Sequence, residues 1–182
     1  MENTYKMKVA GVERDLPICP VNDDLSIAAF VIFGDVELTC KCAEELIKKI
    51  PEHDVMIAAE AKSIPLIHEM ARQMGVNKYV LARKIPKLYM KEPMSVSVKS
   101  ITTESVQTLY IDKTDADYMK GKRVLIVDDV ISTGESIKAV EKLVELAGGN
   151  IVGKAAILAE GGAKERNDII FLEPLPLFIK NN

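Results

Sequence analysis

The architecture follows from one segment, Val124-Leu125-Ile126-Val127-Asp128-Asp129-Val130-Ile131-Ser132-Thr133-Gly134-Glu135-Ser136. Four consecutive apolar residues open it and predict a strand that is buried on both faces, as in a parallel sheet covered by helices. Two acids and a short Ser/Thr/Gly loop follow the strand, and an apolar helical pattern follows the loop. In such a sheet the loop lies beyond the carboxyl ends of the strands, where α/β proteins bind ligands.

The rest of the chain repeats this alternation of strand and helix. Short apolar or β-branched runs predict strands at Val55 to Ala59, Lys78 to Ala82, Arg123 to Asp128 and Ile151 to Ala159. Apolar residues at helical spacing predict helices at Val36 to Ile50, Pro65 to Met74 and Ile137 to Ala147. The fold class is therefore α/β, with a mainly parallel sheet flanked by helices.

Three segments depart from the alternation. Residues 1–35 and 161–182 have little period, and we expect them to form a small cap around a core of residues 36–160, within one compact domain. A long connection runs from Arg83 to Thr108, with a weak strand pattern at Met94 to Val98. Because compact domains rarely hold so long a connection without a functional reason, we interpret it as a mobile lid.

Composition excludes several classes of function. The 182 residues are 48% hydrophobic with a formal net charge of -3, which disfavours a binder of nucleic acid, because such proteins concentrate positive charge. The longest apolar run, Ile27 to Phe33, is too short for a bilayer, which needs ~20 residues, so no membrane association is expected. Three cysteines and two histidines give no zinc-site spacing, and an odd number of cysteines after a polar start indicates the cytoplasm.

The residues that follow Val127 suit a site for a phosphorylated sugar. Backbone N–H groups of the next loop and the positive end of the following helix favour a phosphate monoester, and the hydroxyls of Ser132, Thr133 and Ser136 add donors. Asp128 and Asp129 suit vicinal sugar hydroxyls, directly or through a magnesium shell. The structural alternative is that Ser132 and Glu135 form a capping box and that the acids only end a strand.

The same segment resembles the 5-phosphoribosyl 1-diphosphate signature of type I phosphoribosyltransferases, and the order of elements over residues 36–160 is similar to the purine branch of that family. The resemblance implies a homodimeric enzyme that transfers the phosphoribosyl group of 5-phosphoribosyl 1-diphosphate to a purine base. It implies that Asp128 and Asp129 hold the ribose hydroxyls and, through water, Mg²⁺. It also implies that the 5-phosphate lies on the loop formed by Ser132, Thr133, Gly134, Glu135 and Ser136.

Two further segments are similar to parts of this family. The first, Glu60-Ala61-Lys62-Ser63-Ile64-Pro65-Leu66, resembles the diphosphate loop of adenine phosphoribosyltransferases and archaeal hypoxanthine enzymes. It implies that Lys62 faces the diphosphate, rather than being a solvated lysine, and that a cis peptide bond lies at Ala61-Lys62. The second, Tyr79 to Leu88, resembles the strand that enters the mobile lid. It implies that cations lie where they stabilise the departing diphosphate, and these are Arg83, Lys84 and Lys87.

The identity of the base is harder to assign. Glu104 approximately matches an acid in the lid of the adenine branch, and Ser132 stands where the hypoxanthine-guanine branch carries Asp. Adenine is therefore favoured, and hypoxanthine, guanine or xanthine come next. Apolar residues of the two chain ends are the candidates to contact the base, namely Phe30, Phe33, Phe171, Leu172 and Phe178.

A hypothesis from another class is a regulator that senses phosphoribosyl diphosphate without turnover. Such regulators usually append a DNA-binding helix pair or present a basic face. The acidic balance of this chain and the presence of Lys62, Arg83 and Lys84 favour the enzyme.

Overall fold

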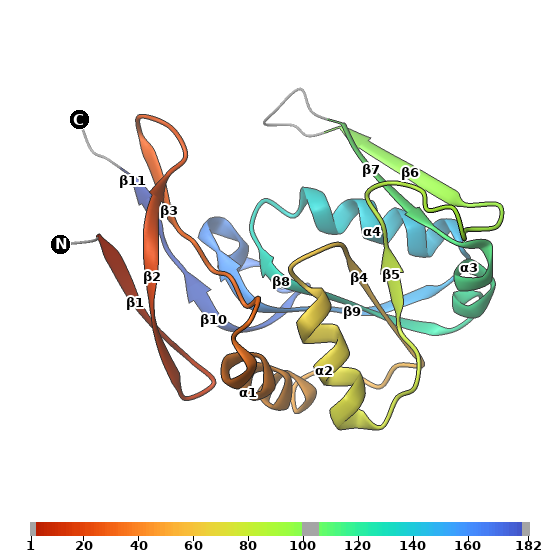
Figure 1. The fold of residues 1–182 in the computed structure, drawn as a ribbon, viewed down its shortest axis with the longest axis horizontal. Coiled ribbons are helices and arrows are strands. Elements are labelled where there is room, and N and C mark those ends of the chain that lie inside the picture. Colours follow the sequence, from red (N-terminus) through yellow and green to blue (C-terminus); the bar gives the residue numbers. More distant parts are fainter. Residues whose placement is uncertain (1–2, 100–105, 180–182) are drawn as a thin grey trace.

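A computed structural model of the chain describes residues 3–99 and 106–179. Its centre is a five-stranded sheet with the order β10-β9-β8-β4-β5, in which every pairing is parallel (Figure 1). The strands are β4 (Val55–Ala59), β5 (Val80–Ala82), β8 (Arg123–Ile131), β9 (Asn150–Glu160) and β10 (Ile170–Leu175). The prediction of a mainly parallel sheet is confirmed.

Helices cover both faces of this sheet. On one face lie α1 (Val36–Ile47) and α2 (Ile64–Met74), and on the other lie α4 (Glu135–Leu146) and the short α3 (Lys113–Met119). The apolar run of β8 serves both sides, since Leu125 and Val127 pack with α1 and α2, whereas Val124 and Ile126 pack with α4. This alternation explains why the strand reads as a continuous apolar run. None of the helices described is long and apolar enough to cross a membrane.

Local signals set the ends of the helices. Oδ1 of Asp35 accepts a hydrogen bond from the N–H of Leu38 at 3.1 Å and so caps α1. The helix ends at Ile47 rather than at the predicted Ile50, since Pro51 disfavours helical backbone in the residue before it. Gly75, with a left-handed φ of +69°, ends α2.

The connection interpreted as a lid contains an antiparallel hairpin of β6 (Met94–Lys99) and β7 (Val106–Ile111). The first of these strands covers the predicted Met94 to Val98, whereas the second is a strand that the sequence pattern does not indicate. Met94, Val96 and Val98 pack on the same core as α4. Arg83 joins the hairpin through two backbone hydrogen bonds with Tyr110, each 2.8 Å long. The mobility of this region stays a prediction.

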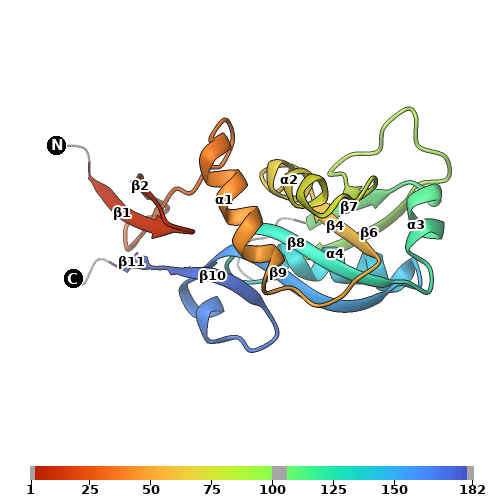
Figure 2. The ribbon, with the colours of Figure 1, turned by 90° about the horizontal axis from the view of Figure 1, so that it is seen from below.

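The chain ends contribute to a second, antiparallel sheet with the order β1-β2-β3-β11, which lies beside the β10 edge of the main sheet (Figure 2). Its strands are β1 (Thr4–Val9), β2 (Val12–Pro20), β3 (Leu25–Ala28) and β11 (Leu177–Ile179). The rings of Tyr5 and Phe178 meet edge to face, with centroids 5.7 Å apart. The described part of the C-terminal segment, residues 161–179, is therefore divided, because β10 belongs to the main sheet and β11 to the small one.

Candidate active site

A cleft opens at the carboxyl edge of the main sheet, where β4, β5 and β8 end. Lys62 lines it from the loop after β4, Lys84 from the loop after β5, and Asp128, Asp129 and Ser136 from the end of β8 and the start of α4. Residues that the sequence analysis selects from three distant segments therefore meet in one place. Parallel strands produce this convergence because their carboxyl ends lie at the same edge.

The two acids lie inside β8, which continues to Ile131 instead of ending at Asp128 as predicted, because Val130 and Ile131 still pair with β9. Asp129 is 4% exposed, and its Oδ2 lies 3.2 Å from Nζ of Lys62. Apart from this ammonium, the oxygen has no polar partner in the part of the chain that the structure describes. A buried carboxylate oxygen with so little protein coordination favours a ligand that brings hydroxyl groups or a cation.

The environment of Asp128 gives a testable pH dependence. Burial and, second, the charge of Asp129 raise the pKa of the Asp128 carboxyl well above its usual range. The folded protein then keeps a proton that the unfolded chain releases, so the free energy of unfolding falls as pH rises from the usual carboxyl range toward the raised pKa. We expect Asp128→Asn to remove this fall, so that the variant gains thermal stability over the parent chain as pH increases.

Thermal unfolding from acidic to slightly alkaline pH measures this effect. Asp54→Asn is the control of opposite sign, since hydrogen bonds from Arg123 lower the pKa of Asp54 to about 2. The stabilisation from Asp54 is present above its unfolded pKa and is lost as pH falls through the lowered value. Identical pH profiles for the parent chain and Asp128→Asn would contradict the raised pKa.

The loop after β8 forms a small pocket at the start of α4, lined by Asp128, Ser132, Thr133, Gly134 and Ser136 among others. The helix begins at Glu135, and its N-cap is Gly134 with a left-handed φ of +82°. The capping-box alternative for Ser132 and Glu135 is therefore wrong, because the N-cap is Gly134 and Ser132 lies two residues before it. The first N–H groups of α4 thus stay available to an anion.

The loop after β4 turns one residue earlier than predicted. Its cis peptide bond joins Glu60 to Ala61, not Ala61 to Lys62. The N–H of Glu60 still donates to the carbonyl of Ala82 in β5, at 2.9 Å, and the chain leaves the sheet directly after it. Ser63 is buried at the start of α2 and donates its hydroxyl hydrogen to the carbonyl of Ala59 at 2.5 Å.

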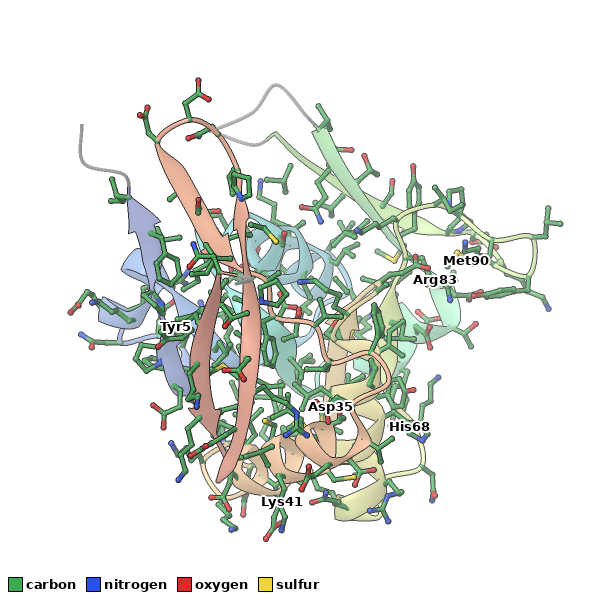
Figure 3. All side chains as sticks on the ribbon, turned by 60° about the vertical axis from the view of Figure 1, so that its left-hand side comes forward. Tyr5, Asp35, Lys41, His68, Arg83 and Met90 are labelled. Carbon is green, nitrogen blue, oxygen red and sulfur yellow. The ribbon has the colours of Figure 1, made fainter. Side chains whose placement is uncertain are left out.

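The predicted cations differ in their surroundings. Arg83, labelled in Figure 3, forms an ion pair with Glu60 at 3.2 Å, so a carboxylate already compensates its charge. Glu60 also accepts the backbone N–H of Lys84 at 3.0 Å, and this bond first, then Arg83, lowers its pKa. Lys84 is exposed and lines the cleft, whereas Lys87 is half-buried three residues on and is not among the residues that line it. Glu104 lies outside the described residues.

A second pocket adjoins the cleft and shares Lys62 and Val130 with it. Its wall contains the backbone segment 27–31, Leu175 and the carboxylate residue Glu160 at the end of β9. Of the apolar candidates for base contact, Phe30 lines this pocket, whereas Phe33 is exposed. Phe30 is also buried in the hydrophobic core, at 3% exposed. The other three pack against the core without lining this pocket, namely Phe171, Leu172 and Phe178.

The sequence analysis missed three polar residues of the two pockets. Glu60 directly follows β4 and Glu160 is the last residue of β9. An acid directly after a buried apolar run was a usable signal, as it was for Asp128. Gln107 reaches the cleft from β7, where its amide oxygen accepts a hydrogen bond from the hydroxyl of Ser136 at 3.4 Å. No local pattern indicates this contact, since it depends on how the hairpin folds back over α4.

Fold and site together define an α/β protein with a place for a phosphorylated, hydroxyl-bearing ligand at the edge of a parallel sheet. The model of the phosphoribosyl transferase domain matches residues 37–175, and the chain belongs to the phosphoribosyltransferase family. The resemblance inferred from the sequence is thus confirmed, and with it the assignment to enzymes that transfer a pentosyl group.

Individual relatives agree with this family. An adenine phosphoribosyltransferase of Rhodococcus jostii is 35% identical over 138 residues, which cover 74% of this chain and 75% of the relative. A hypoxanthine/guanine phosphoribosyltransferase of Methanococcus voltae is 32% identical over 150 residues, covering 82% of this chain and 73% of the relative. The crystal structure of adenine phosphoribosyltransferase from Thermoanaerobacter pseudethanolicus shares the fold, with a TM-score of 0.68 at 23% identity over 87% of this chain and 93% of that one.

Proposed function

We propose that the protein is a purine phosphoribosyltransferase that moves the phosphoribosyl group of 5-phosphoribosyl 1-diphosphate to a purine, with adenine favoured, and releases diphosphate. The observation that carries this proposal is the convergence in one cleft of an acid pair, two lysines and the loop at the start of α4. These groups match the hydroxyls, the diphosphate and the 5-phosphate of the donor.

Each part of the cleft has a role in the proposed reaction. Asp128 and Asp129 accept hydrogen bonds from the ribose hydroxyls, and the loop of Ser132, Thr133, Gly134, Glu135 and Ser136 binds the 5-phosphate. Lys62, Arg83, Lys84 and Lys87 are proposed to serve the diphosphate, with Glu104 as the acid of the lid. The ring nitrogen of the base then displaces diphosphate through an oxocarbenium-like state, which the protein favours by position and charge.

Magnesium fits the residues of this cleft. Within the described parts of the chain, the buried Oδ2 of Asp129 has only the Lys62 ammonium, at 3.2 Å, as a polar partner. Oxygen ligands with negative charge are those that Mg²⁺ prefers. Asp128 and Asp129 are therefore proposed to hold Mg²⁺ through water. When bound, the ion would neutralise negative charge on the diphosphate.

The base is proposed to occupy the pocket between Phe30 and Glu160. Ile27 and Val31 offer accessible apolar surface, whereas Phe30 and Leu175 line the pocket but are buried. The Glu160 carboxylate accepts hydrogen bonds but donates none. The exocyclic amino group of adenine suits such an acceptor. Several relatives carry the name adenine phosphoribosyltransferase, which also favours adenine. Hypoxanthine, guanine and xanthine remain the second choice, supported by the relative from Methanococcus voltae.

An assay of diphosphate release tests the proposal. The protein is mixed with the donor, Mg²⁺ and one base at a time from a panel of purines and pyrimidines. We expect release with purines and the highest kcat/KM with adenine. Donor binding without release for any base would instead support the regulator that senses the donor, and release with a pyrimidine alone would overturn the purine assignment.

The choice of base gives a separate prediction. In Glu160→Gln the side-chain amide can donate to the 6-oxo group of hypoxanthine and loses the charge that strengthens the bond to an amino group. The ratio of kcat/KM for adenine to that for hypoxanthine should fall by about tenfold, which corresponds to ~1.4 kcal/mol of transition-state binding energy. Exposed Glu165→Gln on the following turn is the control and should leave the ratio unchanged. An unchanged ratio in Glu160→Gln would show that Glu160 does not contact the base.

We further propose that the enzyme is a cytoplasmic homodimer without affinity for nucleic acid or membranes. The net charge of -3 and the short apolar runs support the last two points. Light scattering during gel filtration measures the mass directly, and a single peak at the mass of one chain would exclude the dimer.

A further inference from the structure

A four-residue charge network lies next to the phosphate-loop pocket and has no role in the proposed chemistry. Arg166 follows β9 and a short 3-10 turn, and its guanidinium holds the carboxylate of Asp168 in a fork, with Nε–Oδ1 at 2.9 Å and Nη2–Oδ2 at 2.7 Å. Lys154 in β9 donates to the same Asp168 oxygen at 2.6 Å and to Glu141 of α4 at 2.5 Å. The network thus ties the connection after β9 to the helix that begins at the phosphate loop.

The third nitrogen of the guanidinium faces the phosphate loop itself. A Cβ added to Gly134 would clash with Nη1 of Arg166, so the guanidinium occupies the space that only glycine leaves open. In the described ranges Nη1 makes no hydrogen bond of its own. Gly134 is also the N-cap of α4, so the position of Arg166 bears on the first N–H groups of the helix.

The charges of the network indicate whether Arg166 attracts a ligand directly or acts by holding the loop in place. Two cations, Arg166 and Lys154, face two carboxylates, Glu141 and Asp168, and the network as a whole is neutral. Arg166 is not among the residues that line the phosphate-loop pocket. Its effect on a ligand is therefore expected to come from where it holds the loop and not from direct attraction.

We propose that Arg166 is a positioning residue for the phosphate loop. Fixed by Asp168, it packs against Gly134 and keeps the start of α4 in the geometry that receives a phosphate monoester. The inference rests on the proposed function, in which this loop binds the 5-phosphate. Preorganised N–H groups bind an anion more tightly than a loop that must first be ordered.

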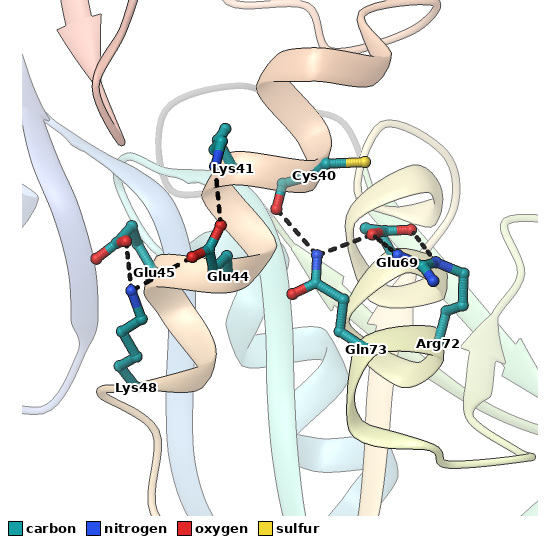
Figure 4. A network of polar contacts seen from close by, with 8 residues as sticks. All are labelled: Cys40, Lys41, Glu44, Glu45, Lys48, Glu69, Arg72 and Gln73. Atoms are coloured by element: carbon teal, nitrogen blue, oxygen red, sulfur yellow. Dashed lines mark hydrogen bonds and ion pairs between the residues drawn. The ribbon is translucent and has the colours of Figure 1, made fainter.

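Calorimetric titration with ribose 5-phosphate and with diphosphate tests the proposal. In Arg166→Ala the dissociation constant for ribose 5-phosphate should rise about tenfold, while that for diphosphate should change less than about twofold. The matched control is Arg72→Ala, since Arg72 holds Glu69 in the same fork, at 2.9 and 2.7 Å, within α2 (Figure 4). Both dissociation constants should stay at the parent values in this control.

Arg166→Lys separates position from charge and remains useful if Arg166→Ala does not fold. Lysine keeps the positive charge but cannot hold Asp168 in a planar fork and reach Gly134 together. Arg166→Lys should therefore weaken the binding of ribose 5-phosphate nearly as much as Arg166→Ala does. Parent affinity in Arg166→Lys would overturn the positioning role, and so would parent affinity in Arg166→Ala or equal loss for both ligands.

A double-substitution cycle with Gly134→Ala adds an independent measurement. If Arg166 acts through Gly134, the loss in Gly134→Ala/Arg166→Ala should be smaller than the combined losses of the two single variants. Additive losses of affinity would show that Arg166 does not act through Gly134. These titrations need no turnover, so a parent chain that binds ribose 5-phosphate yet releases no diphosphate would refute the proposed function and leave this inference standing.

Discussion

Replacement of both Asp128 and Asp129 by Asn is expected to lower the affinity for the phosphoribosyl donor by about 10²- to 10⁴-fold. A hydrogen bond to a charged group contributes roughly 1.5 to 3 kcal/mol, and the proposed role gives each acid at least one such bond to a ribose hydroxyl. A bound cation favours the ionised form of Asp128, so both acids are charged in the complex with Mg²⁺. Asn keeps the shape of Asp but cannot supply the charge that the hydroxyls and Mg²⁺ require.

The fold should survive this double substitution. The carboxyl group of Asp128 is unfavourable to ionise where it lies, as its raised pKa indicates. Lys62 loses the partner at 3.2 Å, but its side chain is 49% exposed and water can solvate the freed charge. The loss of affinity should therefore appear without a matching loss of thermal stability.

Calorimetry with the donor and Mg²⁺ measures the effect directly. A matched control replaces two acids of α3, Asp115 and Asp117, by Asn, because each forms an ion pair with a lysine at the surface away from the cleft. This control should bind the donor as the parent chain does. Parent affinity in the Asp128/Asp129 variant would refute the assignment of the acids to the ribose.

The main sheet was predictable from sequence because its strands are buried on both faces. Val55 to Ala59 and the apolar start of β8 read as continuous apolar runs, and their parallel pairing follows from the helices between them. The meeting of Lys62 with Asp129 then follows from topology alone, since both residues lie at the carboxyl edge.

The small sheet of the chain ends was missed although β1 and β2 carry a usable signal. Tyr5, Met7 and Val9 alternate with Lys6 and Lys8, and a turn with positive φ at Ala10 and Gly11 joins the two strands. Strand β10 was not predicted for another reason, because Pro174 is unfavourable in a central strand. In the structure this strand lies at the edge of the sheet, where a proline is tolerated.

Lys84→Ala is expected to lower kcat by about 10²-fold, with a much smaller change in donor affinity. Among the four cations proposed to serve the diphosphate, Lys62 is paired with Asp129 and Arg83 with Glu60. Lys84 lines the cleft and has no ion pair in the part of the chain that the structure describes. Its charge is thus available for the negative charge that grows on the departing diphosphate.

The distinction between turnover and binding makes this prediction specific. Charge on the leaving diphosphate grows only as the bond to the sugar breaks, so a cation placed there stabilises the transition state more than the bound donor. Alanine at position 84 keeps the backbone N–H that donates to Glu60, and the loop should therefore hold its shape. Single-turnover rates give the chemical step, and calorimetry gives the donor affinity.

Lys91→Ala is the matched control, because Lys91 is exposed further along the same connection and anchors it through its backbone N–H to Asp112. That variant should keep the parent kcat. Lys87→Ala should have a smaller effect than Lys84→Ala, since Lys87 does not line the cleft. If Lys84→Ala instead weakened donor binding as much as it slowed turnover, Lys84 would bind the donor uniformly, and stabilisation of the leaving group would have to come from Lys62 or Arg83.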